Sequence, residues 1–158
     1  MALPPILRDT LRLPVVASPL FIISHPALVL AQCRAGVVGA FPALNARPEA
    51  QLRDWLAEIT EGLAVSTNER RPAPFAVNQI VHKSNARLDH DLRLCVDFKV
   101  PIVISSLGAV EEVNQAVHSY GGIVLHDVIH DRHARKAIEK GADGLIAVAA
   151  GAGRHAGP

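Results

Sequence analysis

Short apolar runs alternate along the chain with segments whose apolar positions recur every three or four residues. The runs predict six β-strands, and glycine, proline or polar residues bound each of them. They lie at residues 14–18, 37–41, 75–78, 101–106, 122–126 and 144–149. Because none of these runs alternates strictly between apolar and polar residues, they predict strands buried on both faces, as in a parallel sheet.

Segments with a helical period separate the predicted strands, at residues 26–35, 48–64, 86–98, 109–119 and 131–140. Pro26 suits the first turn of the first helix, and Gly36 marks its end. We expect the second helix to bury a stripe of five apolar side chains: Leu52, Trp55, Leu56, Ile59 and Leu63. The third is expected to face inward with Leu88, Leu92 and Cys95, and the fourth with Val110, Val113 and Val117.

Regular alternation of strands and helices leaves two architectures, a barrel or a doubly wound open sheet. Small or polar residues end most of the strands, namely Ser18, Asn78, Ser105 and His126. These ends converge on one face in a barrel, whereas in an open sheet only the switch point is used. The pattern therefore favours a parallel α/β fold of the TIM-barrel (β/α)8 type.

The length of 158 residues is short for that fold, since a closed barrel needs about 200–250 residues. We therefore expect residues 1–158 to form a single but incomplete barrel domain. About six βα units are present in this interpretation, the closing strands are missing, and the chain is truncated at its carboxyl end.

Composition excludes several classes of protein. Hydrophobic residues make up 49%, charged residues 20%, and the net charge is +1, so nothing indicates disorder or nucleic-acid binding. Cys33 and Cys95 match no zinc or disulfide spacing and are expected to be buried thiols. No signal peptide or apolar run of about 18 residues is present, so we expect a cytoplasmic protein without a membrane span.

The last predicted strand runs into a glycine-rich segment, residues 151–157, that contains His155. Glycines let the backbone approach a planar or anionic ligand, and histidine titrates where a general base is useful. The segment matches neither a Walker loop nor a dinucleotide-binding GxGxxG motif. From the pattern alone, a catalytic loop and a structural turn with a solvated histidine both remain open.

In context this segment resembles the signature of the nitronate monooxygenases, formerly called 2-nitropropane dioxygenases. The similarity rests on Gly-Ala-Asp-Gly-Leu-Ile at residues 141–146 and Ala-Gly-Arg-His-Ala-Gly at 152–157. Pro-Val-Val-Ala-Ser-Pro-Leu at 14–20 resembles the family's first strand, and Asn78 and Ser105 fit in order. The resemblance implies an FMN-binding TIM barrel that oxidises alkyl nitronates with O2 to a carbonyl compound and nitrite.

The resemblance also implies roles for individual residues. His155 falls where the family has its catalytic base. The residues that match flavin-contacting positions are Ser18, Pro19, Leu20, Asn78, His126, Val148, Gly151 and Gly153. The implied partners are a small nitronate or nitroalkane and O2, with no nucleic acid, no membrane and no metal.

Two departures from the family pattern stand out. Arg154 replaces the glycine that usually precedes the histidine. The family's last two strands, which hold the FMN phosphate through backbone N–H groups, have no counterpart here, so we expect weak or no FMN retention.

Three alternatives stay open. A flavin enoyl-acyl-carrier-protein reductase or an NAD(P)H:quinone reductase would share the first-strand and histidine-loop patterns. A non-catalytic fragment is the third, and unpaired sheet edges would then favour a homo-oligomer.

Two local patterns have simpler interpretations. His126, His130 and His133 resemble a metal cluster, but they span a strand end and the next helix, so a solvated loop is favoured. Ser105 and Ser106 are interpreted as the N-cap of the following helix, because Glu111 and Glu112 lie in its first turn.

Overall fold

The computed structural model describes residues 3–65, 71–150 and 152. His155, Gly151 and Gly153 lie outside these residues. The strands are β1 (Gly39–Pro42), β2 (Phe75–Ile80), β3 (Ile102–Ser106), β4 (Ile123–Val128) and β5 (Gly144–Ala147). No helix in the described part of the chain is long and apolar enough to cross a membrane.

In the described residues, six α-helices and one 3-10 helix accompany the strands. They are α1 (Pro5–Arg8), α2 (Pro26–Ala35), η1 (Ala43–Asn45), α3 (Gln51–Ala64), α4 (Leu88–Asp97), α5 (Glu111–His118) and α6 (Asp131–Glu139). The prediction for α2 is confirmed at both ends. Pro26 occupies its first turn, and Gly36 ends it with a φ of 87°, a left-handed conformation that glycine adopts without strain.

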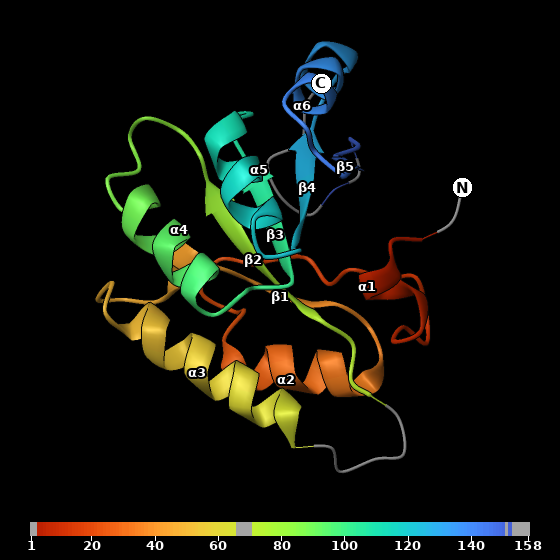
Figure 1. The fold of residues 1–158 in the computed structure, drawn as a ribbon, viewed down its shortest axis with the longest axis vertical. Helices are drawn as coiled ribbons and strands as arrows, with labels where there is room; N and C mark the ends of the chain where they lie inside the picture. Colours follow the sequence, from red (N-terminus) through yellow and green to blue (C-terminus); the bar gives the residue numbers. More distant parts are fainter. Residues whose placement is uncertain (1–2, 66–70, 151, 153–158) are drawn as a thin grey trace.

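The sheet is entirely parallel, with its strands in the order β1-β2-β3-β4-β5. Each strand therefore lies next to its neighbour in sequence, as in a barrel wall. Helices α2 to α6 lie on one side of this curved sheet, and α1 lies on the other (Figure 1). The parallel α/β architecture of the barrel type expected from the sequence is confirmed.

The first predicted strand, residues 14–18, is only partly formed. It makes a single parallel bridge, Val16 to Val38, in which the Val38 N–H donates to Val15 O and the Ala17 N–H to Val38 O. The expected burial is wrong, because Val15 and Val16 remain 44% and 37% exposed. Among the described residues this segment has one sheet neighbour, β1, so its other edge has no strand against it.

Two apolar cores lie on opposite faces of the sheet. The larger one is built from the helix-facing side chains of the strands and from α2, α3, α4 and α5, and Trp55 packs edge-on against Phe41 with ring centroids 5.7 Å apart. The smaller one covers the inner face, where α1 contributes Leu7 and the strands contribute Val38, Ala40, Ala76, Ile102 and Ile104. Side chains of a strand alternate between these two cores.

Both cysteines belong to the larger core, as the sequence predicts. Burial raises the pKa of Cys33 to about 11 and that of Cys95 to about 12. The stripe expected on α3 is also confirmed, since Leu52, Leu56 and Ile59 are fully buried.

The inward face of α4 differs from the expectation. Cys95 is buried, but Leu88 and Leu92 are only half-buried, whereas Asp91 and Leu94 are buried. The buried side of α4 therefore includes Asp91, which forms an ion pair with Arg87 at the start of the helix. The spacing of apolar residues does not predict such a pair.

Candidate functional site

A cavity of about 390 Å³ lies on the inner face at the carboxyl ends of the strands. Three stretches of chain form its walls: residues 16–20, the strand residues Ile104 and Asp127, and residues 146–148 with Ala152. The sites of α/β barrels lie at this end. The volume falls within the 300–1,000 Å³ typical of small-molecule pockets.

A larger cavity, about 830 Å³, opens at the opposite end of the sheet, near Pro5, Pro101 and Gly122. It lies beside the amino ends of the strands, and residues at this end of a barrel contribute to stability rather than to the active site. The smaller cavity is therefore the candidate site.

Six of the predicted cofactor-contacting residues are described and can be compared with this cavity directly. Ser18, Pro19 and Leu20 line it together with Val148, which is distant from them in the sequence. Asn78 is buried on the inner face of the sheet but is not among the residues that line the cavity. His155, Gly151 and Gly153 fall outside the described residues, and Ala152 is the described residue of that segment that reaches the cavity.

A chain of hydrogen bonds crosses β2, β3 and β4 behind the cavity. The Asn78 Nδ2 donates to Ser106 Oγ at 2.7 Å and to Ile104 O at 3.0 Å. The Ser106 hydroxyl donates in turn to Asp127 Oδ2 at 2.6 Å. The three residues share the inner face because the parallel register pairs Ile80 with Ser106 and places Asp127 next along β4.

This chain fixes the orientation of Asp127 in the cavity wall. Among the described residues that line the cavity, Asp127 is the one that carries a charge. The remaining wall is mostly aliphatic, with Leu20, Ile104 and Ile146. The cavity therefore suits a flat, largely apolar group with a few polar atoms.

Ser105 and Ser106 do not cap a helix, and that interpretation is wrong. Both lie inside β3 and are buried, and α5 begins five residues beyond Ser106, at Glu111, with Val110 before it. Ser105 points to the helix side and donates to Gly108 O at 3.2 Å. Leu107 turns the chain with a φ of 61°, which separates the strand from the helix.

His126 lies on the face of β4 opposite to the cavity. It follows Val124 by two positions along the strand, so it faces the same side as Val124, which packs in the helix-side core. The His126 side chain is buried. Its Nδ1 faces Asp127 O at 2.8 Å, and its Nε2 faces Gly108 O. The structure therefore does not bring His126 together with Ser18, Leu20 and Val148, which line the cavity.

His130 and His133 stack at the start of α6, with ring centroids 3.7 Å apart. His130 caps the helix by accepting from the His133 N–H. Desolvation, and then the nearby charges of His130 and Arg132, lower the pKa of His133. Within the described ranges, no three His, Cys, Asp or Glu side chains gather in a way that could hold a metal ion.

The loop that forms one cavity wall is held by a residue that the sequence did not single out. Asn45, at the end of η1, donates from Nδ2 to Leu20 O at 3.0 Å and to Ser24 O at 2.9 Å. Its Oδ1 accepts from the Ile22 N–H at 3.2 Å. Ser24, which is fully buried, accepts from the Leu20 N–H at 2.9 Å.

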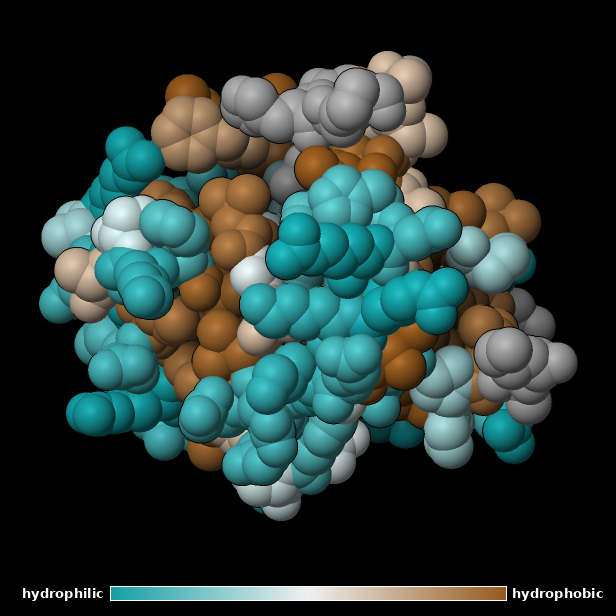
Figure 2. All heavy atoms as spheres, turned by 90° about the horizontal axis from the view of Figure 1, so that it is seen from above, coloured by the Kyte–Doolittle hydropathy of each residue, from teal (hydrophilic) through white to brown (hydrophobic). Residues whose placement is uncertain are grey.

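The same loop exposes four consecutive apolar side chains, Leu20 to Ile23. Ile22 is 76% exposed and has a φ of 67°, a conformation that is strained for a β-branched residue. Seen from the α6 side, hydrophilic side chains gather over the middle of the molecule, with apolar surface on both flanks (Figure 2).

No protein-family model matches the chain, and no curated protein matches it. Solved structures do. A methionine-to-alanine variant of FabK from Thermotoga maritima is similar over 96% of this chain and 47% of its own, with a TM-score of 0.77 and 24% identity. Nitroalkane oxidase from Streptomyces ansochromogenes is similar over 91% and 48%, with a TM-score of 0.75 and 22% identity.

A mandelate oxidase variant that carries an FMN adduct is similar at a lower level, with a TM-score of 0.56, 17% identity, and coverage of 85% and 48%. At these identities the likeness shows the fold, a part of a TIM-type barrel. The chain spans about half the length of the solved structures that it matches.

Proposed function

We propose that the protein is an FMN-dependent oxidoreductase that converts an alkyl nitronate and O2 into a carbonyl compound and nitrite. The observation that carries this proposal is the inner-face cavity at the carboxyl ends of the strands. Residues 16–20, from the first-strand segment of the resemblance, form one of its walls, and residues 146–148, from the strand that runs into the histidine segment, form another. The likeness to nitroalkane oxidase adds support.

The cavity residues fit a flavin ring. Leu20, Ile146 and Val148 would face its apolar surface, while Ser18 and the Ser106-bound Asp127 would supply polar contacts at its edge. FMN, when bound, supplies the electron transfer and oxygen chemistry. The protein orients the substrate beside the ring and excludes water.

His155 is the proposed general base that forms the nitronate when the substrate is a neutral nitroalkane. It would remove the proton from the carbon that bears the nitro group of a neutral nitroalkane, and its ordinary titration range suits that task. The assignment rests on the resemblance of residues 152–157 to the family signature.

A second candidate is a flavin-dependent reductase that takes hydride from a nicotinamide. FabK, an enoyl-acyl-carrier-protein reductase, is similar in fold over nearly the whole chain.

Anaerobic reduction of the flavin distinguishes the two candidates. The FMN-loaded protein is mixed either with ethyl nitronate or with NADH and NADPH, and the loss of absorbance near 450 nm is followed. Bleaching by the nitronate alone supports the monooxygenase, whereas rapid bleaching only by a nicotinamide supports the reductase. Protein that takes up no FMN would contradict both.

A further inference from the structure

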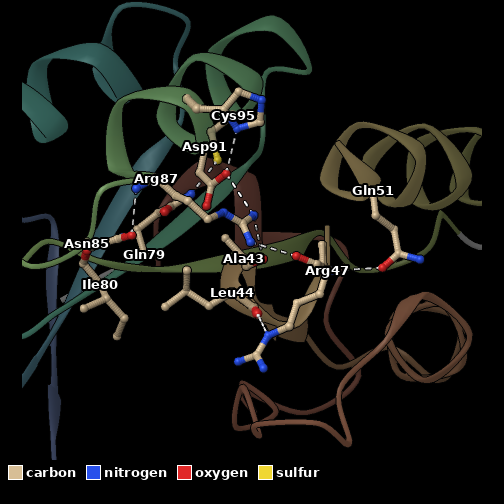
Figure 3. Close-up of polar contacts among 12 residues, drawn as sticks. Ala43, Leu44, Arg47, Gln51, Gln79, Ile80, Asn85, Arg87, Asp91 and Cys95 are labelled. Atoms are coloured by element: carbon tan, nitrogen blue, oxygen red, sulfur yellow. Dashed lines mark hydrogen bonds and ion pairs between the residues drawn. The ribbon is translucent and has the colours of Figure 1, made fainter. Parts of the chain in front are cut away.

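A group of buried polar side chains joins η1 to α4 and β2, on the helix side of the sheet (Figure 3). Arg87 lies at its centre. Its Nη1 donates to Ala46 O at 2.8 Å, and its Nη2 donates to Ala43 O at 3.4 Å. The same Nη2 forms an ion pair with Asp91 Oδ1 at 3.1 Å, one turn along the chain.

The pair is strongly desolvated. The Asp91 side chain is fully buried, that of Arg87 is 19% exposed, and His90 Nδ1 also lies 2.9 Å from Asp91 Oδ1. Buried ion pairs of this kind are often no more stabilising than apolar residues of the same size, because the desolvation cost offsets the attraction. Asp91 Oδ2 and Arg87 Nε have no hydrogen-bond partner among the described residues, which increases that cost.

The distinctive property of Arg87 is the position of its fork. It binds the two carbonyl groups on either side of the turn that carries Asn45, at Ala43 and Ala46. Both alanines are buried, so their carbonyl groups have little access to water. The fork therefore fixes the backbone from which the Asn45 side chain projects.

Asn45 then passes this constraint to the cavity wall. Its three hydrogen bonds reach Leu20, Ile22 and Ser24, and Leu20 lines the cavity. The loop between Pro19 and His25 contains a strained Ile22 and a run of exposed apolar side chains. Apart from Phe21, whose ring centroid lies 5.1 Å from the Arg47 guanidinium carbon, these exposed side chains add little to the stability of the loop, because most of their surface faces solvent.

We infer that Asn45 and the Arg87–Asp91 pair behind it are positioning residues that hold the Ser18–Leu20 wall in the shape that receives the flavin ring. This inference rests on the proposed flavin site for its functional meaning. Asn45, Arg87 and Asp91 form this clamp in the free protein, so its effect on the loop can be measured without any ligand.

The test compares three variants by amide hydrogen exchange and by FMN titration. Asn45→Ala removes all three loop contacts. The double variant Arg87→Met/Asp91→Leu removes both charges together, so that no buried charge is left unpaired. Asn114→Ala is the control, since Asn114 likewise donates from Nδ2 to a backbone carbonyl, Lys140 O at 2.6 Å, at the end of α6.

In the free protein, Asn45→Ala is expected to speed exchange of the Ile22 amide at least tenfold, and the double variant several-fold. Both are expected to weaken FMN binding about tenfold, and the double variant is also expected to be less stable in urea unfolding, because the buried Ala46 O loses its Arg87 donor. Asn114→Ala lowers stability without changing either readout.

Unchanged exchange at residues 20–24 in Asn45→Ala, or an equal change in Asn114→Ala, would overturn the inference. If the exchange results hold but the native protein binds no FMN, the clamp stands and the proposed function fails. A structural role alone would lower the unfolding free energy of all three variants and leave the loop amides protected.

Discussion

The amide Nδ2 of Asn78 on β2 donates to the hydroxyl of Ser106 on β3 across 2.7 Å. The Ser106 hydroxyl in turn donates a hydrogen bond to Asp127 on β4, so one hydroxyl connects the polar ends of three adjacent strands. Asn78 and Ser106 are separated by 28 positions in the sequence. The parallel register alone brings them together on the cavity side of the sheet.

Removing the Ser106 hydroxyl tests the importance of this chain of hydrogen bonds. Ser106→Ala removes one hydrogen bond from the buried Asn78 amide and one from the half-buried Asp127 carboxylate, so we expect a loss of about 1–2 kcal/mol in the free energy of unfolding. We also expect FMN binding to weaken about fivefold, because Asp127 loses one of the contacts that orient it. Urea unfolding and FMN fluorescence quenching measure the two effects.

Ser105→Ala is the control for that variant. Ser105 is equally buried but faces the helices and donates to Gly108 O. It should cost about 1 kcal/mol of stability and leave FMN binding unchanged. An equal effect of both variants on FMN would show that the Ser106 chain has no special relation to the cavity.

Two neighbouring isoleucines test the strain in the cavity loop. Ile22→Gly relieves a φ of 67° and removes a side chain that is 76% exposed. Ile23, at 59% exposure, has no positive φ, so Ile23→Gly incurs only the entropic cost of glycine, about 0.5–1 kcal/mol. Ile22→Gly should therefore be more stable than Ile23→Gly by about 1–2 kcal/mol in thermal or urea unfolding. Equal stabilities would mean that the loop is unstrained.

The buried thiols make stability fall at alkaline pH. A thiol in the unfolded chain ionises near the ordinary pKa of 9.0, whereas the folded values are about 11 for Cys33 and about 12 for Cys95. Since the unfolded state releases its protons first, the free energy of unfolding is constant below about pH 8. It then declines between pH 9 and 11 by roughly 1 kcal/mol per pH unit for each thiol.

Urea unfolding at pH 8, 9 and 10 checks this decline. The double variant Cys33→Ala/Cys95→Ala is less stable at every pH, because it opens space in the core, but its stability should stay level up to pH 10. Above that pH the raised pKa of the half-buried Tyr120 adds a decline of the same sign. A native protein whose stability is level from pH 8 to 10 would contradict the burial of these thiols.

The proposed base can be tested by substrate choice. His155→Asn should abolish activity on neutral nitroalkanes, at least a hundredfold, because no group then removes the carbon proton. Activity on pre-ionised nitronates should change by less than fivefold. An equal loss on both substrates in steady-state assays would indicate that His155 serves binding rather than proton removal.

The regular parts of the fold could be predicted from sequence because their signals are local. Pro26 and Gly36 bracket α2, and the stripe from Leu52 to Leu63 selects the buried side of α3. Four residues that the family resemblance gives as flavin contacts, at 18–20 and 148, line the cavity at the carboxyl ends of the strands.

The missed features depend on which face of a strand a side chain occupies. The run from Gly122 to His126 contains no alternation of apolar and polar residues, so its pattern does not indicate that His126 faces the helices and Asp127 the cavity. Ser106 was interpreted as a helix cap because the acidic first turn of α5 follows it. Its partners Asn78 and Asp127 come from other strands. Asn45 and Arg87 gave no signal, since each acts through backbone groups distant in sequence.

The most direct test of the account is an FMN titration, followed by fluorescence quenching, of two variants that differ in one position along β5. Ile146 lines the cavity, and its neighbour Leu145 is 40% exposed. The account predicts saturable one-to-one binding by the native protein, near-native binding by Leu145→Glu, and at least a hundredfold weaker binding by Ile146→Glu. Absence of saturable binding by the native protein, or equal binding by the two variants, would contradict the placement of the flavin in the inner-face cavity.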